Sequence, residues 1–123
     1  MKIERIDHLN LTVGNIDRSV EFYKRVLGME TESVSDRRAA LYFGQQKIHL
    51  DAARDATAMG GEKRMPAHIC FITQEPVAAV MAHLERCGVP VRMGPGPRAG
   101  ATGTIQSVYI DDPDQNSIEI SSY

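Results

Sequence analysis

Short stretches of the chain alternate hydrophobic with polar residues, and this period of two predicts β-strands. Two other stretches place apolar residues three and four positions apart, which predicts amphipathic helices. One helix is expected over about residues 18–27, capped by Asp17 and ended by Gly28, and the other from Pro76 to Gly88. The expected strands are residues 5–13, 31–36, 39–44, 47–53, 67–73, 89–93, 105–110 and 117–121. The Gly/Pro-rich residues 94–103 are expected to form a mobile loop.

The two halves of the chain repeat the same order of elements. His68 follows His8 by 60 residues, and the pairs Val20/Val80 and Gly28/Gly88 have the same spacing. We therefore expect an α+β fold of two tandem βαβββ modules, about residues 1–56 and 66–123, within a single domain spanning residues 1–123. Residues 59–66 read as the linker. The modules are expected to form one curved, barrel-like mixed sheet with helices outside and a cleft inside.

Strand parity gathers polar side chains on the face expected to line this cleft. Of the four histidines, His8, His49 and His68 fall on it, and Glu119 falls on the corresponding face of the last strand. Aligning Ile48 with Ile118 makes His49 the counterpart of Glu119. Imidazole and carboxylate suit a divalent cation such as Zn, Ni, Co, Mn or Fe, so these four residues are the predicted metal ligands.

Two alternatives to this ligand set remain open. A register slip of two residues would replace His49 by Asp51, and a set of His8, His68 and Glu119 alone would form a facial triad. The fourth histidine, His83, is expected to be solvated on the second helix.

Composition limits the function further. The formal net charge of −2 gives no electrostatic footprint for nucleic acid, and no apolar run is long enough to span a membrane. The alternating, charged start is unlike a signal peptide, so a cytoplasmic location is expected. There, Cys70 and Cys87 are expected to be small buried residues without a disulfide.

The stretches "IDHLNLTVGNIDRSVEFYKRVLGME" and "DPDQNSIEI" resemble the vicinal-oxygen-chelate superfamily, which includes glyoxalase I, fosfomycin-resistance proteins and extradiol dioxygenases. The resemblance covers nearly the whole chain and is greatest to small proteins like glyoxalase I (lactoylglutathione lyase). It implies paired βαβββ modules, metal ligands at the positions of His8, His49, His68 and Glu119, and a homodimer, sometimes with modules swapped between subunits. The chain departs from the family pattern at Gln115, where glycine is usual, and at His49, where glyoxalase I has a carboxylate.

The resemblance implies chemistry on a small substrate that chelates the metal through two neighbouring oxygens. For lactoylglutathione lyase-type chemistry, with glutathione as co-substrate, Glu119 is the candidate base. Glutathione carries two carboxylates, so arginines near the cleft are candidate contacts. The candidate contacts are Arg37, Arg38, Arg92 and Arg98, and the candidate pocket-lining residues are Phe43, Met93 and Tyr109. The alternatives are an Fe(II) extradiol-type dioxygenase and an antibiotic resistance or binding protein, with or without metal.

Overall fold

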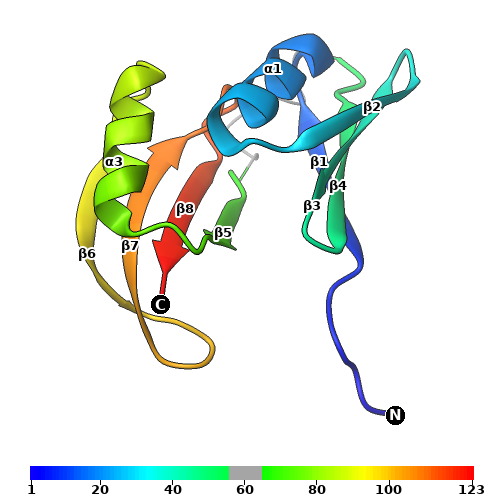
Figure 1. Ribbon diagram of the computed structural model, residues 1–123. Coiled ribbons are helices and arrows are strands. Elements are labelled where there is room, and N and C mark those ends of the chain that lie inside the picture. Colours follow the sequence, from blue (N-terminus) through cyan, green and yellow to red (C-terminus); the bar gives the residue numbers. More distant parts are fainter. Residues whose placement is uncertain (56–64) are drawn as a thin grey trace. The chain divides into compact units, whose positions relative to one another are not determined.

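The computed structural model of the protein describes residues 1–55 and 65–123, which form two compact units. Unit 1 is Met1–Met65 and unit 2 is Pro66–Tyr123. The units are described separately below (Figure 1). Most of the expected linker, residues 59–66, lies outside the described residues. No helix in the described part of the chain is long and apolar enough to cross a membrane.

Unit 1 is a four-stranded sheet with a helix packed on one face. Its strands are ordered β1-β4-β3-β2, with β1 parallel to β4 and the other neighbours antiparallel. Helix α1 packs on β2, β3 and β4. The elements are β1 (His8–Val13), α1 (Ile16–Leu27), β2 (Glu30–Ser35), β3 (Arg38–Phe43) and β4 (Gln46–Ala52).

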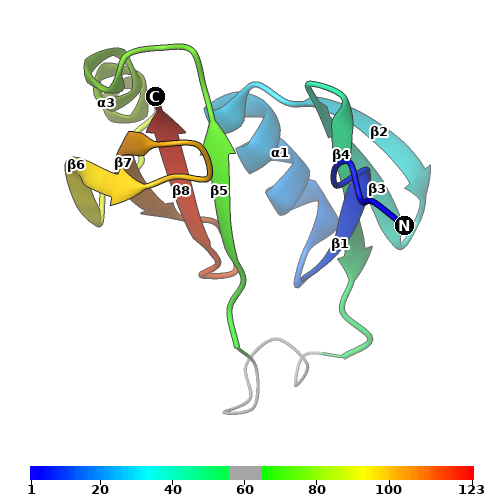
Figure 2. The ribbon, with the colours of Figure 1, turned by 90° about the horizontal axis from the view of Figure 1, so that it is seen from below.

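Unit 2 repeats this topology. Its sheet has the order β5-β8-β7-β6, with β5 parallel to β8, and helix α3 packs on β7 and β8 (Figure 2). The elements are β5 (His68–Ile72), α3 (Val77–Arg86), β6 (Met93–Ala99), β7 (Thr104–Asp111) and β8 (Ser117–Ser122). The prediction of two βαβββ modules is therefore confirmed. Each unit forms its own four-stranded mixed sheet, so the strands do not make one closed barrel.

Each unit buries the apolar face of its own sheet against its helix. In unit 1, Tyr23 of α1 is fully buried, as are Ile48 and Leu50 of β4. In unit 2, Leu84 of α3 is fully buried, as is Ile118 of β8. Because side chains alternate across a strand, burying this face turns the intervening residues of β4 and β8 to the opposite, polar face.

The start of α1 differs from the prediction. Asn15, not Asp17, is the N-cap, and its side-chain oxygen accepts a hydrogen bond from the backbone N–H of Arg18 at 2.9 Å. Asp17 lies in the first turn, where its charge complements the helix dipole. Gly28 ends the helix with φ 67°, as predicted.

The segment expected to be a mobile loop is instead strand β6. Met93–Ala99 pairs antiparallel with β7, with a register irregularity between Met93 and Gly96. The expected strand at residues 89–93 is absent, apart from Met93. β6 lies at the sheet edge, where the missing N–H groups of Pro95 and Pro97 are tolerated, and this explains a strand without alternation.

The turn between β7 and β8 is built on one buried carboxylate. Asp112 Oδ1 accepts hydrogen bonds from the backbone N–H groups of Asp114 and Asn116 at 2.8 and 2.9 Å. Asn116 Nδ2 donates to the other carboxylate oxygen at 2.8 Å. Gln115 has φ 66°, in the left-handed region that favours glycine, which is the usual residue here in the family that the chain resembles.

We predict that Gln115→Gly stabilises the protein by up to about 1 kcal/mol, because it removes the strain of a left-handed side chain at some cost in unfolded-state entropy. Urea unfolding measures this change. The matched control is Gln45→Gly in the β3–β4 turn, because the φ of Gln45 itself is not positive. This control is expected to lower stability. A Gln115→Gly protein less stable than the parent would contradict the strain argument.

Candidate metal centre

Two imidazoles lie side by side on the polar face of unit 1. His8 of β1 pairs in register with Lys47 of β4, and Asn10 pairs with His49. The two histidines are therefore diagonal neighbours on parallel strands, and their ring centroids are 5.4 Å apart. This separation allows both rings to coordinate one cation after small side-chain rotations.

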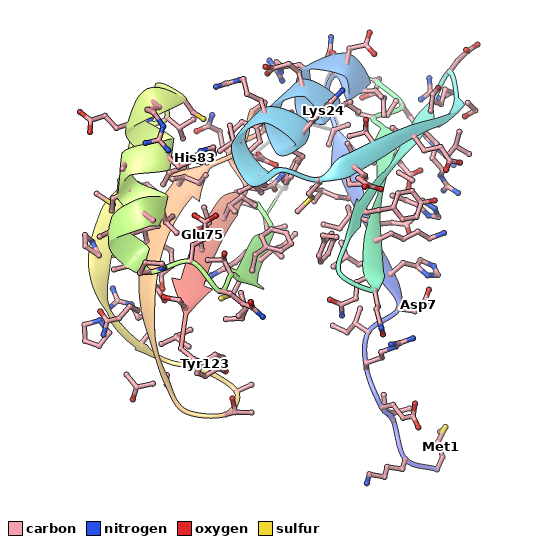
Figure 3. All side chains as sticks on the ribbon, in the orientation of Figure 1. Met1, Asp7, Lys24, Glu75, His83 and Tyr123 are labelled. Carbon is pink, nitrogen blue, oxygen red and sulfur yellow. The ribbon has the colours of Figure 1, made fainter. Side chains whose placement is uncertain are left out.

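His8 is oriented by the residue before it. Its Nδ1 lies 2.7 Å from Asp7 Oδ1, where the N-terminal segment joins β1 (Figure 3). The hydrogen bond to His8 is the largest factor that lowers the pKa of Asp7, so this carboxylate is ionised and accepts. In the neutral ring the lone pair is then on Nε2, the arrangement found in carboxylate–histidine–metal contacts.

His49 is kept neutral by its surroundings. Burial is the largest factor that lowers its pKa, and the positive charges of Lys47 and Arg38 lower it further. A neutral imidazole has a lone pair available for a metal, whereas a protonated one does not.

Asp51, the alternative to His49, is already engaged. It forms an ion pair with Arg38 Nε and accepts a hydrogen bond from Asn10 Nδ2 at 2.7 Å. The bond to Arg38 is the largest factor that lowers its pKa. A metal at Asp51 would have to compete with both partners, so the contacts of unit 1 favour His49 as the second donor.

Unit 2 places a histidine and a carboxylate in the same relation. His68 of β5 pairs in register with Ser117 of β8, and Cys70 pairs with Glu119. His68 Nε2 lies 3.0 Å from Glu119 Oε2. In both units the first strand contributes a histidine, and the parallel last strand contributes the second donor at the same diagonal position.

Glu119 lies in a small polar network although it is only 7% exposed. Burial raises its pKa, but hydrogen bonds from Ser107, His68 and Tyr109 outweigh burial, and the net pKa is lowered. Ser121 Oγ also lies 3.5 Å from Glu119 Oε1. This network keeps the carboxylate ionised at neutral pH.

Tyr109 links Glu119 to an arginine. Burial is the largest factor that raises its pKa, and the hydrogen bond to Glu119 raises it further, so the hydroxyl stays protonated and donates. The same hydroxyl accepts from Arg98 Nε at 3.2 Å. The sequence identified Tyr109 only as a candidate pocket residue, and Ser107 and Asp7 were missed. Strand parity places Ser107 on the same face as Tyr109, and Asp7 directly precedes His8. These positions were the signals in the sequence that could have identified both residues.

Other predicted residues lie elsewhere. Phe43 is half-buried, and Met93 is 43% exposed on β6. Cys70 is an exposed free thiol, which contradicts the expected burial; its Sγ lies 3.4 Å from Ser121 Oγ, and it shares the face of Glu119. His83, on α3 (Figure 3), is half-buried with its Nε2 3.5 Å from Cys87 Sγ, so it is less exposed than expected.

Each unit supplies one pair of donors, and the described residues contain no group of three or more His, Cys, Asp or Glu side chains gathered as a metal site. The described geometry therefore gives one donor pair in each unit, characterised by its own local contacts. Each has two of the donors that a divalent cation requires.

With this fold and these donor pairs, the chain belongs to the glyoxalase/bleomycin resistance protein/dioxygenase superfamily, whose model matches residues 5–120. This confirms the resemblance. Virulence protein STM3117 of Salmonella typhimurium is 43% identical over 100% of this chain and 87% of its own length. Its crystal structure has a TM-score of 0.88, with 100% of this chain and 99% of that chain covered.

Two further relatives are more distant. The glyoxalase domain-containing protein RDO1 of Mycosarcoma maydis is 37% identical over 100% of this chain and 70% of its own. A probable lactoylglutathione lyase of Vibrio cholerae is 29% identical over 98% of this chain and 91% of its own. The superfamily thus includes lyases and dioxygenases, whereas the names of the two relatives with higher identity specify no reaction.

We predict that Lys47→Gln raises the pKa of His49 toward the ordinary histidine value of about 6.5, because it removes a neighbouring positive charge. A histidine ring NMR titration measures this pKa. The pKa of His49 is lower in the folded protein than in the unfolded chain. The contribution of His49 to the free energy of unfolding is therefore fully present above the unfolded pKa. It is lost as the pH falls from the unfolded pKa to the folded pKa. Lys24→Gln, at the end of α1, is the control and leaves the pKa unchanged. An unchanged pKa in Lys47→Gln would contradict this assignment.

Proposed function

We propose that the protein is a metal-dependent isomerase or lyase of lactoylglutathione lyase type, which acts on a small substrate with two neighbouring oxygens. The observation that carries this proposal is the repeated donor pair. His8 with His49, and His68 with Glu119, occupy equivalent positions on parallel strands of the two units. The probable lactoylglutathione lyase among the relatives supports the reaction class.

The donor set fits a divalent cation. We infer that His8, His49, His68 and Glu119 bind one such ion per chain, with three neutral imidazoles and one carboxylate. The Asp7 contact to His8 and the lowered pKa of His49 both favour the lone pairs that coordination needs. Such a cation would stabilise negative charge on two neighbouring oxygens of the substrate and so would acidify the adjacent C–H.

Glu119 is the residue proposed to move the proton. Its hydrogen bonds keep it ionised, so it is ready to accept a proton from the substrate carbon. A carboxylate with a lowered pKa is a weak base, which is adequate only because the C–H is acidified. The same carboxylate then returns the proton to the neighbouring carbon.

We predict that the purified protein binds about one divalent cation per chain. His8→Ala, His49→Ala and Glu119→Gln are each expected to weaken binding at least about a hundredfold, because each removes a donor. Calorimetric titration with Zn²⁺ measures these affinities. The matched control is His83→Ala on α3, which leaves binding unchanged. Unchanged affinity in His49→Ala would support the three-ligand facial triad instead.

We predict that the metal-loaded protein converts the hemithioacetal of methylglyoxal and glutathione, and that Glu119→Gln lowers kcat by about 10²–10⁴-fold. The thioester product absorbs in the ultraviolet, which gives a direct rate. His83→Ala again serves as control. Absence of conversion with every divalent metal would contradict the glutathione substrate. Strict dependence on Fe(II) and O₂ with a catechol would instead identify a dioxygenase.

A further inference from the structure

The four arginines considered as substrate contacts differ in their partners. Among the described residues, two of them are paired with carboxylates, and the other two have only neutral acceptors. Arg38 pairs with Asp51, Arg92 Nε pairs with Asp111 Oδ1 at 3.1 Å, and Arg37 Nη2 donates to the carbonyls of Ala52 and Ala53 at 3.2 and 3.1 Å. The charges of Arg38 and Arg92 are thus balanced by carboxylates, whereas Arg37 is held by two backbone carbonyls of unit 1.

Arg98, like Arg37, has no carboxylate partner in the described part of the chain, but it lies beside Tyr109. Its Nε donates to the Tyr109 hydroxyl at 3.2 Å, and its Nη1 donates to the Pro97 carbonyl at 2.7 Å. Both acceptors are neutral. Across residues 1–55 and 65–123, no carboxylate lies within ion-pair distance of Arg98, and Nη2 makes no hydrogen bond. The residue as a whole is half-buried.

The register of unit 2 places Arg98 on the face of the donor pair. Arg98 of β6 pairs with Ile105 of β7, and Tyr109 of β7 pairs with Glu119 of β8. Ile105 and Tyr109 are four residues apart on one strand, so they share a face. The Tyr109 hydroxyl accepts from Arg98, and Tyr109 is the cross-strand partner of Glu119, so one tyrosine lies between the guanidinium and the proposed base.

The held orientation of Arg98 indicates a binding role. The guanidinium carbon lies 5.5 Å from the centroid of the Tyr109 ring, and the two hydrogen bonds fix the plane of the group. A planar guanidinium with donors to spare recognises oxyanions in a bidentate manner. Packing on Tyr109 uses the ring face and leaves the Nη2 donors available.

We propose that Arg98 binds an oxyanionic group of the substrate, and that the natural substrate is a small acid. Its carboxylate or phosphate is additional to the two neighbouring oxygens that chelate the metal. This proposal rests on the proposed metal site and narrows its substrate class. Neutral hydroxy- or oxo-compounds of the same size lack the contact and bind more weakly.

Three 2-hydroxy acids with the same chelating hydroxyl and carboxylate test the proposal. Lactate has no further anionic group, malate adds a carboxylate, and 3-phosphoglycerate adds a phosphate. In the zinc-loaded protein, calorimetry is expected to show about tenfold tighter binding of malate or 3-phosphoglycerate than of lactate. The member bound more tightly identifies the kind of oxyanion.

The variant Arg98→Gln is expected to lose this preference while its affinity for lactate stays within about twofold. Arg92→Gln is the matched control, since Arg92 is ion-paired with Asp111, and it keeps the preference. Zinc stoichiometry and the urea midpoint are measured first in each variant. If Arg98→Gln fails to fold, a second measurement on the wild-type protein replaces it. The ratio of the affinity for malate or 3-phosphoglycerate to that for lactate is measured at low and at high salt. This ratio is expected to fall with salt, because salt screens an ionic contact.

Either equal affinities in the wild type, or a preference that survives in Arg98→Gln, would overturn the anion subsite. So would a wild-type preference that is insensitive to salt. A protein that binds zinc without any acid preference contradicts the anion subsite alone. A protein that binds no zinc contradicts the proposed function, so the two failures are distinguishable.

Discussion

The site depends on the parallel pairing of the first and last strands of each unit. This pairing begins with one backbone hydrogen bond in each: Lys47 N–H to the Asp7 carbonyl at 3.2 Å, and Ser117 N–H to the Ala67 carbonyl at 2.8 Å. The histidine donor follows directly in both strands. A slip of one residue would turn that histidine onto the apolar face, so these bonds decide whether the donors meet.

Amide side chains reinforce the pairing at the same place. Asn116, just before β8, accepts a hydrogen bond from the Ala67 N–H at 2.9 Å, while Asp112 holds its Nδ2. In unit 1, Gln46 Nε2 donates to the Ile6 carbonyl at 2.9 Å. The turn residues Asp112 and Asn116 thus fix the start of β5 as well as the turn between β7 and β8. They connect a local sequence feature to the position of His68.

The sequence predicted the repeated modules because burial imposes a period on each strand and helix. It also predicted which donors share a face, since Ile48 and Ile118 occupy equivalent registers with Leu9 and Ile69. It failed where tertiary context overrides local signals. β6 lies at the sheet edge, where a strand rich in Gly and Pro is tolerated. Asn15 caps α1 because its backbone is extended, whereas the sequence offered Asp17, two residues later, as an equally suitable capping residue. The sequence also did not predict that Arg38 pairs with Asp51 or that Arg98 contacts Tyr109, because these partners lie on neighbouring strands.

The order found in β6 changes the chemistry that the site supports. On a mobile loop Arg98 would lose side-chain and backbone entropy on binding an anion, at about 1–2 kcal/mol for the backbone of each residue fixed. On a paired strand, with its guanidinium oriented by Tyr109 and Pro97, that entropy is already lost in folding. Preorganisation of this kind makes a single arginine effective in selecting substrates. It also links the proposed selectivity to Glu119, because Tyr109, whose hydroxyl accepts from Arg98, is the cross-strand partner of the proposed base.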